Sequence, residues 1–413
     1  MRARVFQHLE RHGDRAGALL QRLVRIPTVN PPGRNYAECT RLLAAELRRL
    51  GLKTRLLPVP AALQRRTLPG TQDFPRFNVV GWWDVGARVT LHFNCHYDVV
   101  PAPAAGWRFG PFDPRVERGK IYGRGTGDMK GAIATVCHAL AGLRATGATP
   151  ACNLEVSFTA DEETDSALGA EWIARHGRLR ATHVIVGEAG SGTAICCGHN
   201  GCLWFNVRIR GRAAHGSTPE AGINAFEKMA ALVTALEGYK ARLVRRSFTA
   251  PDGKVMRPTI NLGGVFAGGD GGKVNTVPDA ACFTVDRRLL PNEDATRAEA
   301  EFRKFVTSAA RRIPQLDVAV ERFTFSSPLF TPPDNPLFRA VAAGVRRVRG
   351  SRARPYVSTG FNDMQFFSHH LGVPVVGYGP IGARYHGVDE CAPVGDLVTT
   401  AKVYADLMLS FAG

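Results

Sequence analysis

Apolar and polar positions divide the chain into two regions of different periodicity. In the first region, short runs of apolar and β-branched residues alternate with segments whose apolar residues recur at helical spacing, a pattern typical of a largely parallel sheet covered by helices. The runs predict strands at 78–82, 89–94, 154–159 and 183–186. The helical spacing predicts helices at 6–23, 36–50 and 131–144.

The pattern changes after residue 197. Residues 203–210 alternate apolar and polar side chains, as a half-exposed antiparallel strand does. The segments that follow predict a helix at 225–237, strands at 259–263 and 281–286, and a helix at 295–312. A Pro-rich stretch at 327–336 then leads to a helix at 337–348 and a strand at 373–378. This order indicates a small α+β sandwich inserted into a larger domain.

We therefore predict an α/β fold with a mostly parallel, mixed sheet flanked by helices. The larger domain would comprise residues 1–197 and 324–413, and the insertion would comprise residues 198–323. A length of 413 residues agrees with this division, because such a chain exceeds one ordinary hydrophobic core.

Composition excludes several classes of protein. With 45% hydrophobic and 22% charged residues, the chain is neither disordered nor fibrous. It has no apolar run near the roughly 20 residues that cross a bilayer, and residues 1–25 show no secretory pattern. The nine cysteines are scattered without a C-x-x-C pair, which indicates reduced thiols. We expect a cytoplasmic protein that binds no membrane.

The net charge of +17 raises the question of nucleic-acid binding. Only nine of the 53 basic residues are lysines, the arginines are spread along the chain, and no basic run is interleaved with aromatic residues. We therefore expect no nucleic-acid partner. An Arg-rich composition together with attraction for a small anionic substrate explains the charge more simply.

Histidines and carboxylates gather at the ends of the predicted strands. They are His96, Asp98, Asp128, Glu162, Glu163, Glu188 and His386. Because ligands of open α/β sheets bind at the carboxyl ends of the strands, we expect these side chains to converge. So many carboxylates would repel one another without a cation among them. Two histidines with several carboxylates suit zinc, manganese or cobalt.

Each of these segments has a simpler interpretation when it is taken alone. An isolated His-x-Asp is usually structural, and Asp161-Glu162-Glu163 is also typical of a solvated acidic loop or of a helix start capped by Asp161. The Gly-rich turn before Asp128 lacks the Lys-Ser/Thr of a phosphate loop, and its carboxylate would repel phosphate. The combined set, in order and at strand ends, favours a metal site.

Six motifs together resemble one enzyme family. They are C-H-Y-D-V-V-P (95–101), G-W-x-F-G-P-F-D-P (106–114), Y-G-R-G-T-G-D-M-K-G (122–131), T-A-D-E-E-T (159–164), V-G-E (186–188) and G-R-A-A-H-G-S-T-P (211–219). Over nearly its whole length the chain resembles the co-catalytic metallohydrolases that include aminoacylase, acetylornithine deacetylase, succinyl-diaminopimelate desuccinylase and glutamate carboxypeptidase. The resemblance implies a catalytic domain like that of dizinc aminopeptidases and a ferredoxin-like insertion that acts as a lid and dimerisation domain.

The same resemblance implies two divalent metal ions per subunit, zinc first, with cobalt and manganese as alternatives. His96, Asp128 and Glu188 would hold one ion. Asp128, Glu163 and His386 would hold the other, which makes Asp128 the bridging carboxylate.

Catalytic roles follow from the resemblance as well. Glu162 would be the general base for a metal-bridging water, and Asp98 would orient the ring of His96. The peptide between Asp128 and Met129 would be cis.

Within the insertion, the resemblance implies that His215 reaches the active site of the neighbouring subunit and steadies the tetrahedral intermediate. The residue pattern alone also allows an ordinary histidine at the end of a strand. Asn275 and Arg288 match positions that grip the substrate carboxylate, with Arg287 as the competing arginine.

The turn at 358–363, which contains Gly360, resembles the Gly-rich substrate loop of the family. It differs by having Phe361 where paired glycines are usual. The segment at 60–76 has no counterpart in the family and receives no role.

We predict a homodimeric dimetal amidohydrolase that cleaves the C–N bond of a small anionic amide, as in N-deacylation of an N-acyl amino acid. The alternatives are a metallo-carboxypeptidase or dipeptidase, and a hydrolase of an unusual non-peptide C–N bond. A non-catalytic binding or assembly protein would lack a metal ligand or the base, and no such residue is missing here.

Overall fold

The computed structural model describes residues 1–269 and 272–413, which form two compact units. The first unit contains Met1–Cys197, Thr331–Tyr356 and Asn362–Gly413, and the second contains Gly198–Phe330 and Val357–Phe361. Sequence analysis ends the insertion at residue 323, whereas the first unit resumes at Thr331. The difference arises because a strand at Asp317–Ser326 pairs within the sheet of the second unit.

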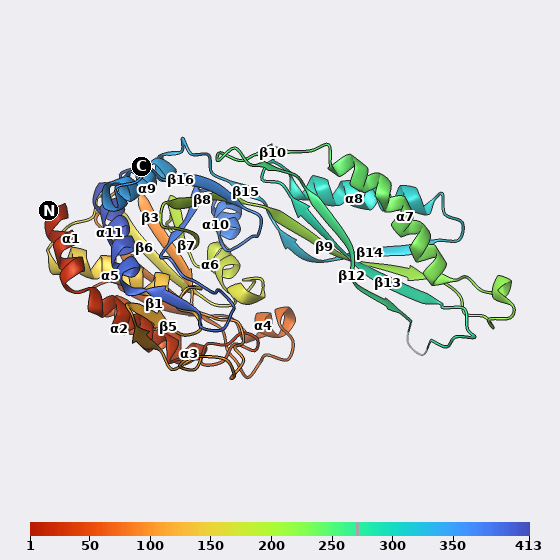
Figure 1. The fold of residues 1–413 in the computed structure, drawn as a ribbon, viewed down its shortest axis with the longest axis horizontal. Helices are drawn as coiled ribbons and strands as arrows, with labels where there is room; N and C mark the ends of the chain where they lie inside the picture. The colour runs from red at the N-terminus through yellow and green to blue at the C-terminus, as the bar shows by residue number, and fades with distance from the viewer. Residues whose placement is uncertain (270–271) are drawn as a thin grey trace. The chain divides into compact units, whose positions relative to one another are not determined.

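A mixed sheet forms the centre of the first unit (Figure 1). Its strands run in the order β1-β2-β6-β3-β7-β17-β8. Their bounds are β1 (Lys53–Pro58), β2 (Phe77–Trp83), β3 (Thr90–His96), β6 (Asn153–Thr159), β7 (His183–Ser191), β8 (Ala194–His199) and β17 (Val375–Gly379). β3 pairs in parallel with β6 and β7, and β17 pairs in parallel with β7, whereas β1, β2 and β8 run antiparallel to their partners. The predicted α/β fold with a mixed sheet is confirmed.

Helices cover both faces of this sheet. Their bounds are α1 (Arg2–Arg11), α2 (Gly13–Val24), α3 (Tyr36–Arg49), α4 (Ala61–Thr67), α5 (Lys130–Ala145), α6 (Ala170–His176), α9 (Pro336–Arg349), α10 (Met364–Leu371) and α11 (Val394–Ser410). On one face, Tyr404 of α11 packs edge-on against Phe93 of β3. On the other face, Phe367 of α10 packs against His92 of β3.

The region predicted as one helix at 6–23 is two helices, α1 and α2. The break falls at His12, which caps both helices. At the next residue, Gly13, a β-carbon would lie 2.7 Å from Cγ2 of Val398 in α11. Leu9 of α1 and Leu20 of α2 are both buried. The single-helix prediction is therefore wrong, because tertiary packing overrides a continuous apolar periodicity.

One face of β3 and β6 is polar although it is fully buried. Nδ1 of His92 lies 2.8 Å from Oε2 of Glu155, and Nε2 of the same ring lies 2.7 Å from Oγ of Ser157. Nδ2 of Asn94 donates to Oγ of Ser157 at 3.0 Å and to Oγ1 of Thr159 at 3.1 Å. These hydrogen bonds pair both ring nitrogens of His92 and the amide NH2 of Asn94, which lowers the cost of burying this polar face beneath α10. Oδ1 of Asn94 is buried without a hydrogen-bond partner among the described residues.

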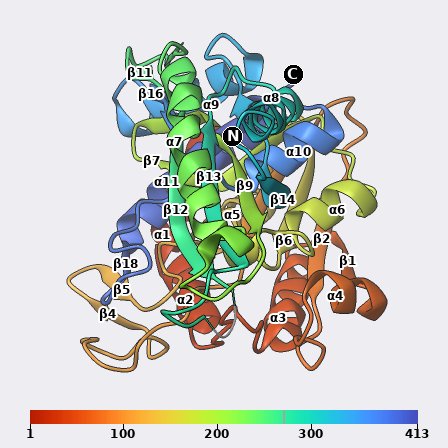
Figure 2. The same ribbon diagram turned by 90° about the vertical axis from the view of Figure 1, so that its right-hand side faces the viewer.

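The main body of the second unit, as far as it is described, is a four-stranded antiparallel sheet with two helices, α7 and α8 (Figures 1 and 2). The strand order is β12-β13-β9-β14. The bounds are β9 (Gly201–Arg210), α7 (Ala225–Leu243), β12 (Thr259–Gly268), β13 (Ala280–Leu289), α8 (Ala295–Ala310) and β14 (Asp317–Ser326). Alternate residues of β9 are buried, and Phe205 stacks on Phe302 of α8 at 4.8 Å between ring centres. The predicted alternation therefore places one face of the sheet against both helices.

The remaining elements are short. They are β4 (Arg115–Glu117), β5 (Lys120–Tyr122), β10 (Phe248–Thr249), β11 (Val255–Met256), β15 (Leu329–Phe330), β16 (Arg354–Ser358), β18 (Cys391–Pro393), and the 3-10 turns η1 (Glu162–Thr164) and η2 (Pro219–Ala221). Within the described part of the chain, every helix is too short or too polar to span a bilayer. No disulfide joins any of the described cysteines.

Candidate metal centre

The residues predicted to bind metal all belong to the first unit. His96 is the last residue of β3, Asp128 lies just before α5, Glu163 lies in η1 after β6, Glu188 lies in β7, and His386 follows β17. His96 and Glu188 were predicted to lie just beyond the ends of their strands. Both lie inside, because β3 and β7 are longer than the apolar runs that predict them.

Asp128 lies between two histidines. Its Oδ1 is 3.0 Å from Nε2 of His96, and its Oδ2 is 3.1 Å from Nε2 of His386. Nε2 of His386 is also 3.3 Å from Oε2 of Glu163. His96 is buried, whereas the side chain of His386 is 53% exposed. The peptide between Asp128 and Met129 is cis, as the family resemblance implies.

Asp98 contacts two parts of this site. Its backbone carbonyl oxygen lies 3.1 Å from Nδ1 of His96, and its Oδ1 lies 3.4 Å from the same nitrogen. Its carboxylate also accepts hydrogen bonds from the backbone N–H groups of Glu162 and Glu163, each at 3.2 Å. One buried side chain therefore links the end of β3 to the turn after β6.

Several carboxyl groups are buried beside these residues. Burial, reinforced by neighbouring carboxylates, raises the pKa of Glu188 to about 8, and it raises the pKa of Glu162 as well. Burial also raises the pKa of Asp363 to about 7. Oε1 of Glu163, Oε2 of Glu188 and Oδ2 of Asp363 are buried without a hydrogen-bond partner among the described residues. These raised pKa values mean that the charged forms of the clustered carboxyl groups are disfavoured unless a cation lies among them.

The two histidines supply the opposing charge. Burial disfavours ionisation of Asp128, but the hydrogen bonds from His386 and His96, together with the charges of both rings, outweigh it and lower its pKa. The hydrogen bonds to Asp128 and Glu163 raise the pKa of His386 to about 10.

The donor set fits divalent cations. Ligand atoms of His96, Asp128 and Glu163 lie within 4.8 Å of one another. The unpartnered oxygens of Glu163 and Glu188 are further donors aimed at no protein group in the described structure. Imidazole nitrogen and carboxylate oxygen are ligands that zinc, cobalt and manganese accept.

A buried ion pair supports the main chain around Asp128. Oε1 of Glu390 accepts hydrogen bonds from the backbone N–H groups of Gly127 at 2.8 Å and Asp128 at 3.1 Å. Its Oε2 binds Nη1 of Arg124 at 2.7 Å, and Nη2 of Arg124 donates to the carbonyl oxygen of His386 at 2.9 Å. The pair therefore connects the turn before α5 to the loop that carries His386.

Asp363 and Glu390 are two residues of this site that were not predicted from the sequence. Asp363 is the last residue of the turn at 358–363, in which Gly360 was the predicted site residue. Oδ1 of Asp363 accepts a hydrogen bond from Oγ of Ser166. Glu390 comes four residues after His386. Proximity to a predicted site residue was the available signal in both cases.

The other predicted residues belong to the second unit, where His215 and Asn275 lie on neighbouring segments. Gly216 N donates to the carbonyl oxygen of Asn275 at 2.7 Å. Nδ1 of His215 lies 2.7 Å from Oγ of Ser217 and accepts from its backbone N–H at 3.2 Å. Because Nδ1 acts as an acceptor, the neutral ring carries its proton on Nε2.

Arg288 has a different environment from its neighbour Arg287. Nε of Arg288 lies 2.9 Å from Oδ1 of Asp286, and its guanidinium lies 5.7 Å from the ring centres of both Trp204 and Phe361. Arg287 is fully buried and paired with a glutamate inside the unit. Of the two arginines, only Arg288 is open to solvent.

Gly360 is exposed, and its backbone N–H donates to Oγ of Ser358 at 3.2 Å. It belongs to the segment Val357–Phe361 of the second unit.

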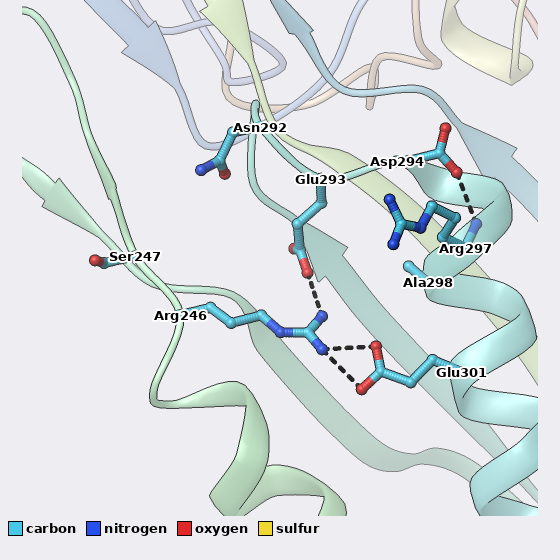
Figure 3. Close-up of a pocket in the computed structure, with 8 residues that line it drawn as sticks. All are labelled: Arg246, Ser247, Asn292, Glu293, Asp294, Arg297, Ala298 and Glu301. Atoms are coloured by element: carbon cyan, nitrogen blue, oxygen red, sulfur yellow. Dashed lines mark hydrogen bonds and ion pairs between the residues drawn. The ribbon is translucent and has the colours of Figure 1, made fainter.

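Figure 3 shows a charged cavity of about 470 Å³ in the second unit. Arg246 crosses it and binds Glu301 through Nη2 at 2.6 and 2.7 Å and Glu293 through Nη1 at 2.8 Å. None of the predicted site residues lines this cavity. Its central charges are paired with one another, so it has the character of a structural ion-pair network.

Residues 92–410 match the model of peptidase family M20/M25/M40. The succinyl-diaminopimelate desuccinylase of Gluconacetobacter diazotrophicus is 28% identical over 404 residues, which cover 96% of each chain. The acetylornithine deacetylase of Pasteurella multocida is 33% identical over 277 residues, 65% of this chain and 66% of that protein.

The fold is also shared with solved structures. A metallo-carboxypeptidase of the M20 family from Sulfolobus solfataricus superposes with a TM-score of 0.73 and 21% identity, over 95% of this chain and 98% of that one. At this level of identity the likeness concerns the fold.

Proposed function

Because the chain belongs to peptidase family M20/M25/M40 and is a metal-dependent hydrolase of amide bonds, we propose that it removes an acyl group from the nitrogen of a small amino acid that bears a carboxylate. The observation that carries this proposal is the position of Asp128, whose two oxygens each face a different histidine. The desuccinylase and deacetylase relatives support N-deacylation over other amide chemistry.

A carboxypeptidase or dipeptidase activity is the second candidate, and the shared fold of the Sulfolobus enzyme favours it. Both activities would use the same centre, because a metal-activated water attacks an amide carbonyl whatever group the nitrogen carries.

In the proposed arrangement, His96, Asp128 and Glu188 hold one cation, and Asp128, Glu163 and His386 hold the other. Zinc is the proposed metal, with cobalt and manganese as alternatives. When bound, the pair of cations would acidify a water molecule and polarise the substrate carbonyl.

Glu162 moves the proton in this proposal. Its neighbour Glu163 would hold a metal ion, and the Glu162 carboxylate would remain free to accept a proton from water and deliver it to the departing nitrogen. Asp98 fixes both residues, since it accepts hydrogen bonds from their backbone N–H groups and contacts the ring of His96.

Residues of the second unit complete the proposal. The Nε2–H of His215 is directed to no described partner and can donate to a developing oxyanion. Asn275 and Arg288 would bind the substrate carboxylate, and Gly360 would allow close approach of the chain to the substrate. The net charge of +17 suits an anionic substrate.

We further propose a homodimer formed through the second unit. β12 lies at the edge of its sheet, and Val265 and Phe266 on this strand are 65% and 73% exposed. A long apolar edge strand is a ready site for pairing with a second copy. Cysteines without disulfides are consistent with the proposed cytoplasmic location.

The test is a panel of N-succinyl, N-acetyl and N-formyl amino acids and dipeptides, assayed with zinc, cobalt and manganese. The proposal expects acyl amino acids to be hydrolysed with higher kcat/KM than dipeptides. The reverse order would favour the peptidase alternative.

Glu162→Ala provides the control for chemistry. We expect it to lower kcat by about 10²–10⁴-fold, because the proton carrier is lost. Metal content should not change, since the side chain ligates neither ion in the proposed arrangement. An active Glu162→Ala enzyme would remove this residue from the mechanism.

A further inference from the structure

The segment between β1 and β2 has no role in the proposed function, yet it is built around a buried side chain. Gln64 of α4 is buried, and its Nε2 donates to the carbonyl oxygens of Thr71 at 2.6 Å and Phe74 at 2.9 Å. The carbonyl oxygen of Phe74 also accepts from Nη1 of Arg76 at 2.5 Å. Gln64 and Arg76 thus bind the same carbonyl oxygen, and this connects α4 to Arg76.

Arg76 forms a buried ion pair with Asp161. Its Nε lies 2.9 Å from Oδ2 and 3.2 Å from Oδ1 of Asp161, and both side chains are 1% exposed. A buried arginine needs a carboxylate partner, and a buried carboxylate needs a cation, so each group requires the other. Asp161 is the residue immediately before Glu162.

The guanidinium fits its site closely. It lies 5.4 Å from the centre of the Tyr36 ring. A β-carbon at Gly33 would lie 2.7 Å from its Cζ, so residue 33 leaves room for the arginine by having no side chain. Lysine could keep the charge at this position but not the planar group that contacts Asp161, Phe74 and Tyr36 together.

Asp161 connects this ion pair to η1. It has φ 63°, in the left-handed region, and its carbonyl oxygen accepts hydrogen bonds from the backbone N–H groups of Thr164 at 3.1 Å and Ser166 at 2.7 Å. Its side chain also accepts from Tyr36 at 3.0 Å and Asn30 at 3.1 Å. The carboxylate and the backbone of one residue therefore determine where η1 starts.

We propose that Arg76 is a positioning residue: by holding Asp161, it fixes the turn that presents Glu162 and Glu163 to the metal centre. Asn30 adds a second connection, since its Nδ2 lies 3.0 Å from Oδ2 of Asp98, which in turn binds the backbone of η1. Without Arg76, Asp161 and Asp98 would share Asn30 with no cation between them and would repel each other. This inference rests on the proposed function, because it concerns the same turn.

The experiment compares zinc binding by the full-length wild type with Arg76→Met and Arg76→Lys, by competition with a chromophoric chelator. We expect Arg76→Met to weaken the binding of at least one of two zinc ions by about tenfold or more, as is usual when a residue supporting a ligand is removed. kcat should fall with unchanged KM. Arg76→Lys should give a smaller loss in the same direction, and it serves alone if the methionine variant does not fold.

Arg287→Met is the matched control, because Arg287 is also a fully buried arginine paired with a glutamate, in the unit that holds no proposed metal ligand. It should lower the melting temperature and leave zinc affinity unchanged. Arg76 variants that melt lower but bind both ions as tightly as wild type would overturn the inference. A wild-type protein that binds fewer than two zinc ions would instead contradict the proposed function.

Discussion

Residues from separate parts of the sequence contact the side chain and the main chain of Asp128. His96 and His386 contact its two oxygens, and Glu390 accepts its backbone N–H. Arg124 joins Glu390 to the carbonyl oxygen of His386. This buried ion pair therefore joins the turn to the histidine loop, beside the hydrogen bond from Gly123 N–H to the carbonyl oxygen of Glu390.

Glu390→Gln tests the role of this ion pair. The amide can still accept the two backbone N–H groups, but it loses the charge that holds Arg124, so the loop of His386 should become less fixed. We expect zinc affinity to fall by about tenfold, measured by chelator competition. Asp406→Asn is the control, because Asp406 is a buried carboxylate paired with Arg347 between two helices that carry no proposed ligand. Equal zinc affinity in the Glu390 variant and wild type would show that the ion pair serves stability alone.

The gathering of histidines and carboxylates could be predicted from their positions at the ends of the predicted strands, whereas the assignment of ligands to each ion came from the family resemblance. The supporting residues could not be predicted, because their partners are remote along the chain. Glu390 contacts the backbone of Gly127 across 263 positions, and Arg76 contacts Asp161 across 85. The chain has 53 basic residues, and the residues next to Arg76 in the sequence do not indicate that this arginine is buried and paired with a carboxylate.

At the level of elements, β3 and β6 were predicted from their apolar residues, but each strand also has a polar face that is buried. Both strands were predicted, yet half of their side chains are polar and form the buried row from Glu155 to Thr159 beneath α10. Period-two alternation usually indicates a strand with one solvated face. Here the helix covers that face, and hydrogen bonds across the two strands replace water.

Ionisation of Glu155 makes the stability of this buried polar face depend on pH. Burial opposes its ionisation, but the hydrogen bond and charge of His92, the backbone N–H of Arg180 and the indole N–H of Trp82 outweigh burial and hold the pKa of Glu155 below its ordinary value of 4.5. A carboxylate with a lowered folded-state pKa stabilises the protein above the unfolded value, and this stabilisation is lost as pH falls through the folded value.

We expect Glu155→Gln to lower the free energy of unfolding by about 1–3 kcal/mol at pH 7, because it leaves buried donors poorly satisfied. The difference from wild type should shrink as pH is lowered below 4.5, and urea unfolding from pH 7 to pH 3 would measure it. Glu237→Gln, at an exposed ion pair with Lys240, should change little at any pH. A difference that widens in acid would contradict the assignment.

For the molecule as a whole, the central question is how the two units share the chemistry. All five proposed metal ligands and Glu162 belong to the first unit, whereas His215, Asn275 and Arg288 belong to the second. If His215 acts on the site of a partner subunit, defects in the two units should complement each other in a mixed dimer.

We expect Glu162→Ala and His215→Ala protomers, each inactive alone, to regain activity when they are unfolded and refolded together. In a heterodimer, one site would combine an intact first unit with an intact His215, so a random mixture should reach roughly one quarter of wild-type activity. Glu162→Ala mixed with His96→Ala is the control, because both changes fall in the first unit and no intact site can form. Verified heterodimers without activity would show that His215 does not act across subunits.

Because His386 is more exposed than His96, the two metal ions would exchange with the solvent at different rates. An ion beside His386 could exchange with the medium, while one beside the enclosed His96 would leave slowly. After brief exposure to a chelator, many protein molecules would then retain only one ion. The specific activity of such a sample would depend on the length of that exposure, and added metal would restore it.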